Sequence, residues 1–216
     1  PILTTNYDYL FEKSNLQIIE FMKLIQYKKN KFRPLRAIDG RKGFTDHYPW
    51  HNYYSDRNIK DALNEFGIWH INGFCDYKNS LRIGISDYTG VINKARQWLH
   101  KLNGNPFHKR ENYSKWFGRN SWLDIFFHSH ILFIGLGLNS DEIALRWLLI
   151  EREKYFRKFP ELRKKTWYIE LDRKKKLKDG KKLFLEKLNI ETVLARNYKQ
   201  VYGVTPKRLK LIKENA

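Results

Sequence analysis

The segment that most constrains the fold is the apolar run from His130 to Ile134, which ends in Gly135-Leu136-Gly137-Leu138 and leads into an apolar helix pattern. Such a run is typical of a buried strand. Glycines at a strand end let the backbone approach a ligand, and a helix N-terminus behind them favours negative charge. Asn139, three residues before Glu142, has the spacing of a capping box and predicts the helix start. A tight turn that needs glycine only for packing is the alternative interpretation.

The same order of strand and helix recurs along the chain. Strand patterns occur at 2–4, 67–71, 130–135, 166–170 and 190–194, and helix patterns at 9–27, 87–102, 143–149 and 174–188. Strands that alternate with helices predict an α/β fold, with a parallel sheet flanked by helices. We expect the first four strands to pair as neighbours through right-handed crossovers.

The composition fits a single domain, 1–216, with a helical and loop insertion at about 13–66. The chain is 42% hydrophobic and 16% aromatic, enough to build a core. Its single cysteine, Cys75, excludes a disulfide framework and a four-cysteine zinc site, and it fits a reducing compartment. The longest apolar run, Ile131 to Leu138, is too short to cross a bilayer. We therefore expect a cytoplasmic protein without a membrane span.

The net charge of +19 is concentrated in the last third of the chain. From Glu151 to Ala216 there are 21 Lys and Arg residues against 9 Asp and Glu residues. A solvated, lysine-rich helix face explains this excess. Attraction to a polyanion, either a dinucleotide or a nucleic acid, is the alternative, so the basic C-terminal third is a candidate nucleic-acid contact.

A second candidate site follows the first strand, where Thr4-Thr5-Asn6-Tyr7-Asp8 comes directly after Ile2-Leu3. Side chains at the carboxyl end of such a strand face the crevice in which open α/β sheets bind their ligands. Asn6 offers a donor and an acceptor, and Asp8 offers a carboxylate. The pair can therefore bind an amide or ribose hydroxyls.

Several segments together resemble a known family. The stretch Thr4 to Asp8 resembles the T-Q-N-x-D motif of sirtuins, and 69–73 is similar to the strand that carries their His-Gly pair. Gly135 to Leu138 stands where sirtuins have G-T-S-L. The nearest resemblance is to bacterial sirtuin-like proteins of antiphage systems that deplete NAD. It extends to their W-x-D-x-F-F segment, acidic pair and W-L-L helix, here at 122–127, Asp141-Glu142 and 147–149.

The resemblance implies a Rossmann-like domain that binds NAD as its substrate and cleaves it to nicotinamide and ADP-ribose or a cyclic form. It implies that Asn6 orients the attacking water or a ribose hydroxyl and that Asp8 holds the carboxamide. The adenosine side would be contacted by the loop after the third strand. The residues that it assigns to NAD binding are Thr5, Asn6, Asp8, Gly135, Leu136, Gly137 and Asn139. Cys75 alone cannot supply the family's four-cysteine zinc module, so a zinc-free relative is implied.

Two departures from the family pattern bear on activity. The G-A-G-x-S loop that holds the pyrophosphate is not in the sequence, so we expect an N-terminally incomplete domain. The family's catalytic histidine precedes a glycine, and Asn72 occupies that place before Gly73. Asparagine cannot titrate and so cannot be a general base. His70 lies two residues earlier, on the same strand face, and is either a substitute base or a structural residue.

These departures leave two functions open. One is an NAD glycohydrolase with weak or no activity in this chain, and the other is a non-catalytic nucleotide-sensing or scaffold module of an oligomeric complex. We expect a homo-oligomer or a partner defence protein, with an aromatic cluster at the interface or packed on the chain's own core: Tyr48, Trp50, Tyr53 and Tyr54. His128 and His130 lack a third ligand at metal-site spacing, so no metal is expected.

Overall fold

The computed structural model describes residues 1–8, 49–55, 59–73, 75, 78–101, 110–139, 141–171, 179–197 and 200–201. The chain divides into two compact units, Pro1–Phe127 and His128–Ala216, and each is described by itself. The helix predicted at 9–27 and much of the predicted insertion lie outside the described residues. The prediction of one domain over the whole chain stays a prediction.

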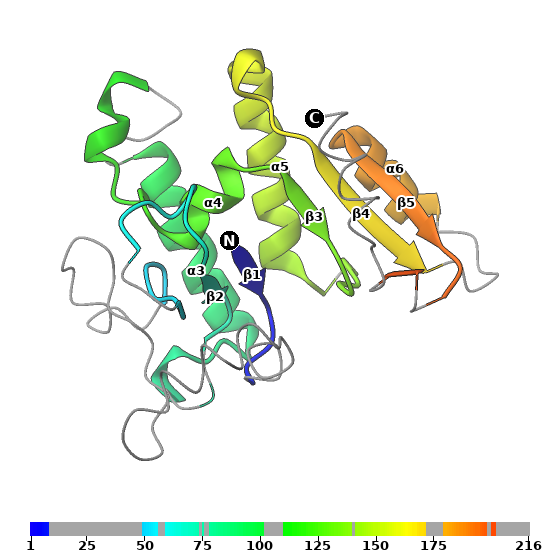
Figure 1. Ribbon diagram of the computed structural model, residues 1–216, viewed down its shortest axis with the longest axis horizontal. Helices are drawn as coiled ribbons and strands as arrows, with labels where there is room; N and C mark the ends of the chain where they lie inside the picture. The colour runs from blue at the N-terminus through cyan, green and yellow to red at the C-terminus, as the bar shows by residue number, and fades with distance from the viewer. Residues whose placement is uncertain are drawn as a thin grey trace. The chain divides into compact units, whose positions relative to one another are not determined.

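The first unit is built on two parallel strands, β1 (Ile2–Thr4) and β2 (Ile68–His70), which lie side by side in Figure 1. Leu3 pairs with Trp69, and Thr4 pairs with His70. Tyr54 adds an antiparallel bridge to Ile68, with its N–H 2.8 Å from the Ile68 carbonyl oxygen. Parallel pairing of 2–4 with 67–71 is therefore confirmed, and it places both strand ends at the same edge.

Polar side chains bind backbone N–H groups at the starts of the two α-helices of this unit. The helices of the unit are the short 3₁₀ helices η2 (Lys78–Ser80) and η3 (Arg110–Lys115), and the α-helices α3 (Ile85–His100) and α4 (Trp122–His128), whose last residue belongs to the second unit. Ser121 Oγ accepts the Leu123 N–H (3.2 Å) at the start of α4. Asp87 lies in the first turn of α3, where its carboxylate accepts the Gly84 N–H (3.1 Å).

The core of the first unit is rich in tryptophan. Trp50 stacks on Trp122 with ring centroids 4.7 Å apart and tilts against Trp98 at 4.9 Å. Trp50, Tyr53 and Tyr54 are only 1–3% exposed. Of the two alternatives given for these aromatics, packing on the chain's own core is therefore the one that holds for all three. Tyr48 lies outside the described residues.

Asp124 is a polar residue inside the largely apolar helix α4, and its hydrogen bonds explain how it can be buried there. Its side chain is fully buried, and both carboxylate oxygens lie 2.7 Å from the Tyr113 hydroxyl. The Asn120 N–H donates to the same carboxylate (2.8 Å). These bonds compensate for the loss of water around a buried charge. Asp124 therefore links η3 to the start of α4.

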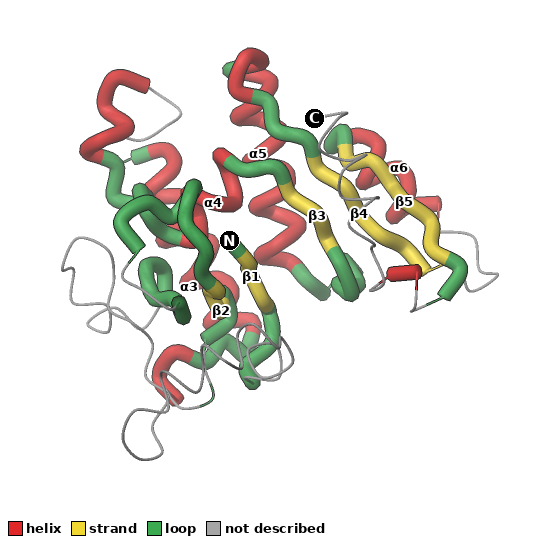
Figure 2. The backbone as a smooth tube through the Cα atoms, in the orientation of Figure 1, coloured by secondary structure: helices red, strands yellow, loops and turns green. Residues whose placement is uncertain are grey.

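The second unit is a three-stranded parallel sheet in the order β3 (Ile131–Phe133), β4 (Thr166–Leu171) and β5 (Ile190–Ala195). Its helices are α5 (Ile143–Lys158), the 3₁₀ turn η4 (Pro160–Leu162) and α6 (Asp179–Lys187). Figure 2 shows the strands in yellow and the helices in red. The predicted α/β class and the parallel pairing of 130–135 with 166–170 are confirmed. The pairing predicted between the strands of the two units stays a prediction.

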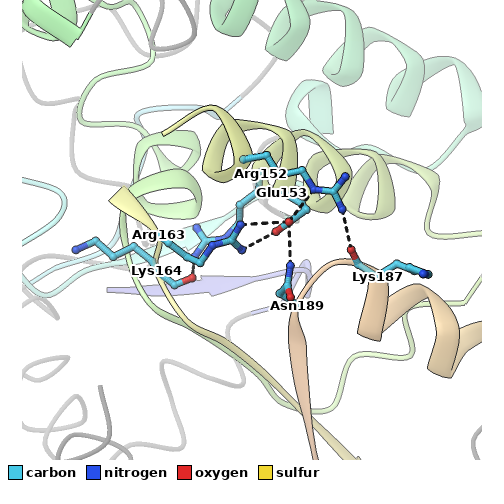
Figure 3. Close-up of polar contacts among 7 residues, drawn as sticks. Arg152, Glu153, Arg163, Lys164, Lys187 and Asn189 are labelled. Carbon is cyan, nitrogen blue, oxygen red and sulfur yellow. Dashed lines mark hydrogen bonds and ion pairs between the residues drawn. The ribbon is translucent and has the colours of Figure 1, made fainter. Parts of the chain in front are cut away.

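A polar cluster at the amino ends of β4 and β5 joins the helices of the second unit to its sheet (Figure 3). Glu153, buried on α5, accepts hydrogen bonds from Arg163 (2.8 Å), Asn189 (2.9 Å) and Arg157 (3.1 Å). Arg152 is buried beside it and donates to the carbonyl of Ser129 at 2.8 Å. The cluster fixes α5 against the turns that lead into both strands.

Among the described helices, none is long and apolar enough to cross a membrane.

Candidate functional site

The first group of candidate residues follows the carboxyl ends of β1 and β2. The Thr4 carbonyl accepts the Ile71 N–H (3.0 Å), and the Thr4 hydroxyl accepts the Asn6 N–H (3.1 Å). The second bond turns the chain as soon as β1 ends. Asn6 and Asp8 are exposed, so this turn presents an amide and a carboxylate to solvent.

His70 is completely buried and contacts the backbone of this turn. Its Nδ1 lies 2.7 Å from the Asn6 carbonyl oxygen, and the edge of its ring meets the Tyr54 ring at a centroid distance of 5.6 Å. A carbonyl only accepts, so Nδ1 must carry the proton in this bond. His70 therefore fixes the position of Asn6 from inside the unit.

Asn72 contacts the same turn from the end of β2. Its side-chain Nδ2 donates to the Thr5 carbonyl (3.3 Å), and its backbone carbonyl accepts the Arg82 N–H (2.9 Å). Gly73 follows with φ +99°, and a Cβ on it would lie 2.1 Å from the Ser80 carbonyl oxygen. Only glycine fits there. The structure thus brings Thr5, Asn6, His70 and Asn72 together.

Sequence reasoning missed a supporting group around Tyr7 and Arg82. The Tyr7 hydroxyl donates to the Arg82 carbonyl, and burial together with the neighbouring Tyr88 raises the pKa of Tyr7 to about 12. Arg82 is buried and forms an ion pair with Asp87 at 3.5 Å. Tyr7 stands at the variable position of its motif. The signal that the sequence offers is an arginine shortly before the helix pattern at 87–102.

The second group is the glycine loop, residues 135–139, which follows β3. Gly135 has φ +70°, and Leu138 has φ +48° although it is not glycine. The Leu138 N–H donates to the Glu142 carboxylate (3.0 Å), and the Leu138 carbonyl accepts from Arg146 (3.1 Å). The predicted capping box at Asn139 is wrong, because Glu142 is itself the N-cap of α5 and reaches back to Leu138.

Contacts from β4 and α6 hold the other side of the glycine loop. The Tyr168 hydroxyl lies 2.6 Å from the Leu136 carbonyl oxygen and 3.3 Å from that of Gly137. Lys181 donates to the Tyr168 hydroxyl (2.6 Å) and to the Glu170 carboxylate (2.7 Å). A Cβ on Gly137 would lie 2.9 Å from the Asn139 amide nitrogen, so the loop is tightly folded. Tyr168 and Lys181 were not predicted.

A protein-family model described as SIR2-like domain matches residues 1–193. This match covers most of the chain. The chain belongs to the SIR2-like domain family. No curated protein and no solved structure gives a significant match.

Membership in the SIR2-like family confirms the resemblance to sirtuins and the Rossmann-like character of the fold, and it supports a function that involves NAD. The two groups of candidate residues lie in different units. Their convergence on one NAD crevice stays a prediction, as do the individual roles of Thr5, Asn6, Asp8, His70 and Asn72.

Within the described part of the SIR2-like chain, no group of three or more His, Cys, Asp or Glu side chains could hold a metal ion. The two histidines considered as ligands have structural contacts instead. His128 Nε2 lies 3.1 Å from the Tyr155 hydroxyl, and His130 Nδ1 accepts the Lys165 N–H (3.1 Å). Burial, together with nearby Lys164, lowers the pKa of His130, which suits its role as an acceptor.

Proposed function

We propose that this SIR2-like domain is an NAD glycohydrolase of antiphage defence, which cleaves NAD to nicotinamide and ADP-ribose. The observation that carries the proposal is the arrangement of Asn6, whose backbone is held by the Thr4 hydroxyl (3.1 Å) and by His70 (2.7 Å). This preorganises an exposed amide at the carboxyl end of a parallel strand, where α/β sheets bind ligands.

Each group then has one role in the reaction. The bond between the ribose C1′ and the nicotinamide nitrogen breaks, and nicotinamide leaves with the electron pair. Water adds to C1′ and releases a proton. Asn6 orients this water or a ribose hydroxyl, and Asp8 holds the carboxamide of the leaving group. His70 is a positioning residue in this proposal, because it is completely buried and its Nδ1 holds the Asn6 carbonyl (2.7 Å).

The second unit would bind the rest of the nucleotide. In this proposal Gly135, Leu136, Gly137 and Asn139 contact the adenosine side. Gly137 is half-buried and has no side chain, so its backbone can approach a ribose closely. NAD is the substrate, and no zinc is needed for this reaction.

In this chain, Asn72 stands where the family has the histidine that acts as the general base. Asn72 donates its amide to the Thr5 carbonyl and has no proton to exchange near neutral pH. General-base catalysis typically contributes about 10² to 10⁴ in rate. We therefore expect the chain to bind NAD and to hydrolyse it slowly or not at all.

An Asn72→His substitution in the full-length protein tests the proposal, with nicotinamide release as the measurement. We expect release to rise by about 10² to 10⁴ over the unsubstituted protein. Asn64→His is the matched control, because Asn64 is an exposed asparagine of the same unit that contacts Asp61. Equal turnover in all three proteins would show that Asn72 does not occupy the catalytic place.

The second candidate function is a non-catalytic nucleotide-sensing or scaffold module. Asn72 and the engagement of His70 with Asn6 favour it. Calorimetry separates the two functions. A sensor binds NAD and ADP-ribose but gains no turnover from Asn72→His, whereas a glycohydrolase with a lost base gains it.

The setting of the function is also a proposal. An NAD-consuming domain must be kept inactive until triggered, so we infer a cytoplasmic homo-oligomer or a complex with a partner defence protein. Light scattering of the full-length protein with and without its trigger tests this, and a monomer in both states contradicts it. The basic C-terminal third could also bind nucleic acid, and such binding should weaken steeply as the salt concentration rises.

A further inference from the structure

We propose that Tyr168, supported by Lys181, is a positioning residue that holds the glycine loop 135–139 in the conformation that receives the nucleotide. The nucleotide part rests on the function proposed above, whereas the effect on the loop does not. Tyr168 lies on β4 and Lys181 on α6, so two elements outside the loop determine its shape.

The direction of the Tyr168 hydroxyl follows from its two partners. The Lys181 ammonium lies 2.6 Å from the hydroxyl oxygen and can only donate, so the oxygen accepts from it. The hydroxyl hydrogen is then available for the Leu136 carbonyl at 2.6 Å, with the Gly137 carbonyl at 3.3 Å. Glu170 accepts from the same ammonium (2.7 Å) and keeps it in place.

The glycine loop needs such a contact because ordering its backbone costs conformational entropy and places Leu138 in an unfavourable conformation. Gly135 at φ +70° and Gly137 lose more conformational freedom on ordering than other residues. Leu138 at φ +48° is strained, because left-handed backbone is unfavourable for a residue with a Cβ. Glu142 and Arg146 bind the loop at Leu138, on the α5 side. Tyr168 supplies the contact at Leu136 and Gly137.

The electrostatics of the site keep the tyrosine a donor. Burial and the neighbouring Glu170 raise the pKa of Tyr168, so it stays protonated under physiological conditions. Lys181 is largely buried, with a side chain 17% exposed, and it forms its ion pair with Glu170 beside the loop. Removing Lys181 leaves the hydroxyl free to rotate away from Leu136.

Two variants and two matched controls test the effect on the loop. Tyr168→Phe removes only the hydroxyl, and Lys181→Met removes only the ammonium. Tyr155→Phe is the control for the first, because Tyr155 is buried in the same unit and its hydroxyl contacts His128. Lys182→Met is the control for the second, because Lys182 is 64% exposed and pairs with Glu186 at 3.8 Å.

Amide hydrogen exchange over 134–142 is measured first, on full-length protein without nucleotide. We expect exchange in both Tyr168→Phe and Lys181→Met to be about tenfold faster than in the unsubstituted protein, as for the loss of one hydrogen bond. The two controls should match the unsubstituted protein over this segment. Unchanged exchange in Tyr168→Phe overturns the proposal, and so does equal acceleration in Tyr155→Phe.

Nucleotide binding is measured second, with NAD and with ADP-ribose. Tyr168→Phe should raise both dissociation constants about tenfold. In the Asn72→His background it should raise KM and leave kcat within about twofold, which a general loss of folding would not do. Equal affinity despite faster exchange overturns the nucleotide part. If the unsubstituted protein binds neither nucleotide while exchange responds as expected, the proposed function fails and the loop assignment stands.

Discussion

The two loops that carry the candidate residues are held by different kinds of contact. In the first unit the turn after β1 is held by a threonine hydroxyl, a histidine ring and an asparagine amide, all of which bind backbone groups. In the second unit the glycine loop is held by the Glu142 carboxylate, by the Arg146 guanidinium and by Tyr168 backed by Lys181. The difference is that charged groups, the Glu142 carboxylate and the Arg146 guanidinium, bind the second loop directly.

This difference predicts different responses to solution conditions. Charge-assisted hydrogen bonds are roughly twice as strong as neutral ones, but salt screens them where they are exposed, and pH changes them. The first turn should therefore depend on shape and packing. The glycine loop should respond to salt, to pH and to the removal of single charges.

The largest expected effect comes from Gly73, where shape alone decides. Gly73→Ala places a Cβ 2.1 Å from the Ser80 carbonyl oxygen on a residue at φ +99°. We expect the free energy of unfolding of the first unit to fall by on the order of 3 kcal/mol. Urea unfolding followed by tryptophan fluorescence measures this.

Gly180→Ala is the matched control for that experiment. Gly180 lies in α6, and an added Cβ meets nothing within 4 Å. Alanine is a better helix former than glycine, so this variant should gain about 1 kcal/mol. If both variants lose stability equally, the space around Gly73 is not what limits the first turn.

The next effect concerns the carboxylate at the glycine loop. Glu142→Ala removes the acceptor of the Leu138 N–H (3.0 Å). We expect a loss of about 2 kcal/mol at low salt, because the bond is charge-assisted and Glu142 is only half-buried. Hydrogen exchange at Leu138 gives the value. Glu186→Ala, on an exposed helical ion pair, should lose almost nothing.

The fold was predictable where local patterns decide it. The apolar runs at Ile131–Phe133 and Thr166–Leu171 form adjacent parallel strands, as predicted. The sequence could not decide between an interface and the core for the aromatic segment at Trp50, because its burial depends on stacking against Trp122, seventy-two positions further along the chain. No periodicity within the segment carries that information.

The candidate site was predictable only in part. Thr5, Asn6 and Asn72 could be found because motifs name them, and the structure places them together. Tyr168 could not be found, because its partner Leu136 lies 32 positions earlier and the contact depends on how β4 pairs with β3. Gly84, with an extended backbone, is the N-cap of α3, so Asp87 lies in the first turn of the helix. Tertiary packing, and not the local sequence alone, determines where such a helix begins.

A smaller effect is expected at His70, and it tests whether the contacts of the first turn are less sensitive to salt than those of the glycine loop. His70→Phe keeps a ring of similar shape but removes the donor to the Asn6 carbonyl (2.7 Å). We expect a loss of about 1 kcal/mol. The loss should be the same at 0.05 M and at 1 M salt, whereas the Glu142→Ala loss should shrink at high salt. Equal salt dependence in the two variants would contradict the comparison.

The smallest effect is on pH dependence, where two glutamates of the second unit should act in opposite directions. Burial raises the pKa of Glu142 above its usual 4.5. The part of its contribution to stability that comes from the raised pKa is therefore full below pH 4.5 and is lost as the pH rises through the raised pKa. The hydrogen bond that the carboxylate accepts from the Leu138 N–H is a separate contribution. Burial alone would also raise the pKa of Glu153, but hydrogen bonds from Arg163 and Arg157 lower it overall. That contribution is present above pH 4.5 and is lost as the pH falls through the lowered pKa.

Urea midpoints measured between pH 3 and pH 7 separate the two glutamates. Glu142→Gln should abolish the decrease in stability that Glu142 causes as the pH rises. Glu153→Gln should abolish the decrease in stability that Glu153 causes as the pH falls. Asn72→Ala, which changes a neutral contact of the first turn, should lower stability by a similar amount at every pH in this range. A pH-dependent loss in Asn72→Ala would show that charge also controls the first turn, and the contrast between the two loops would fail.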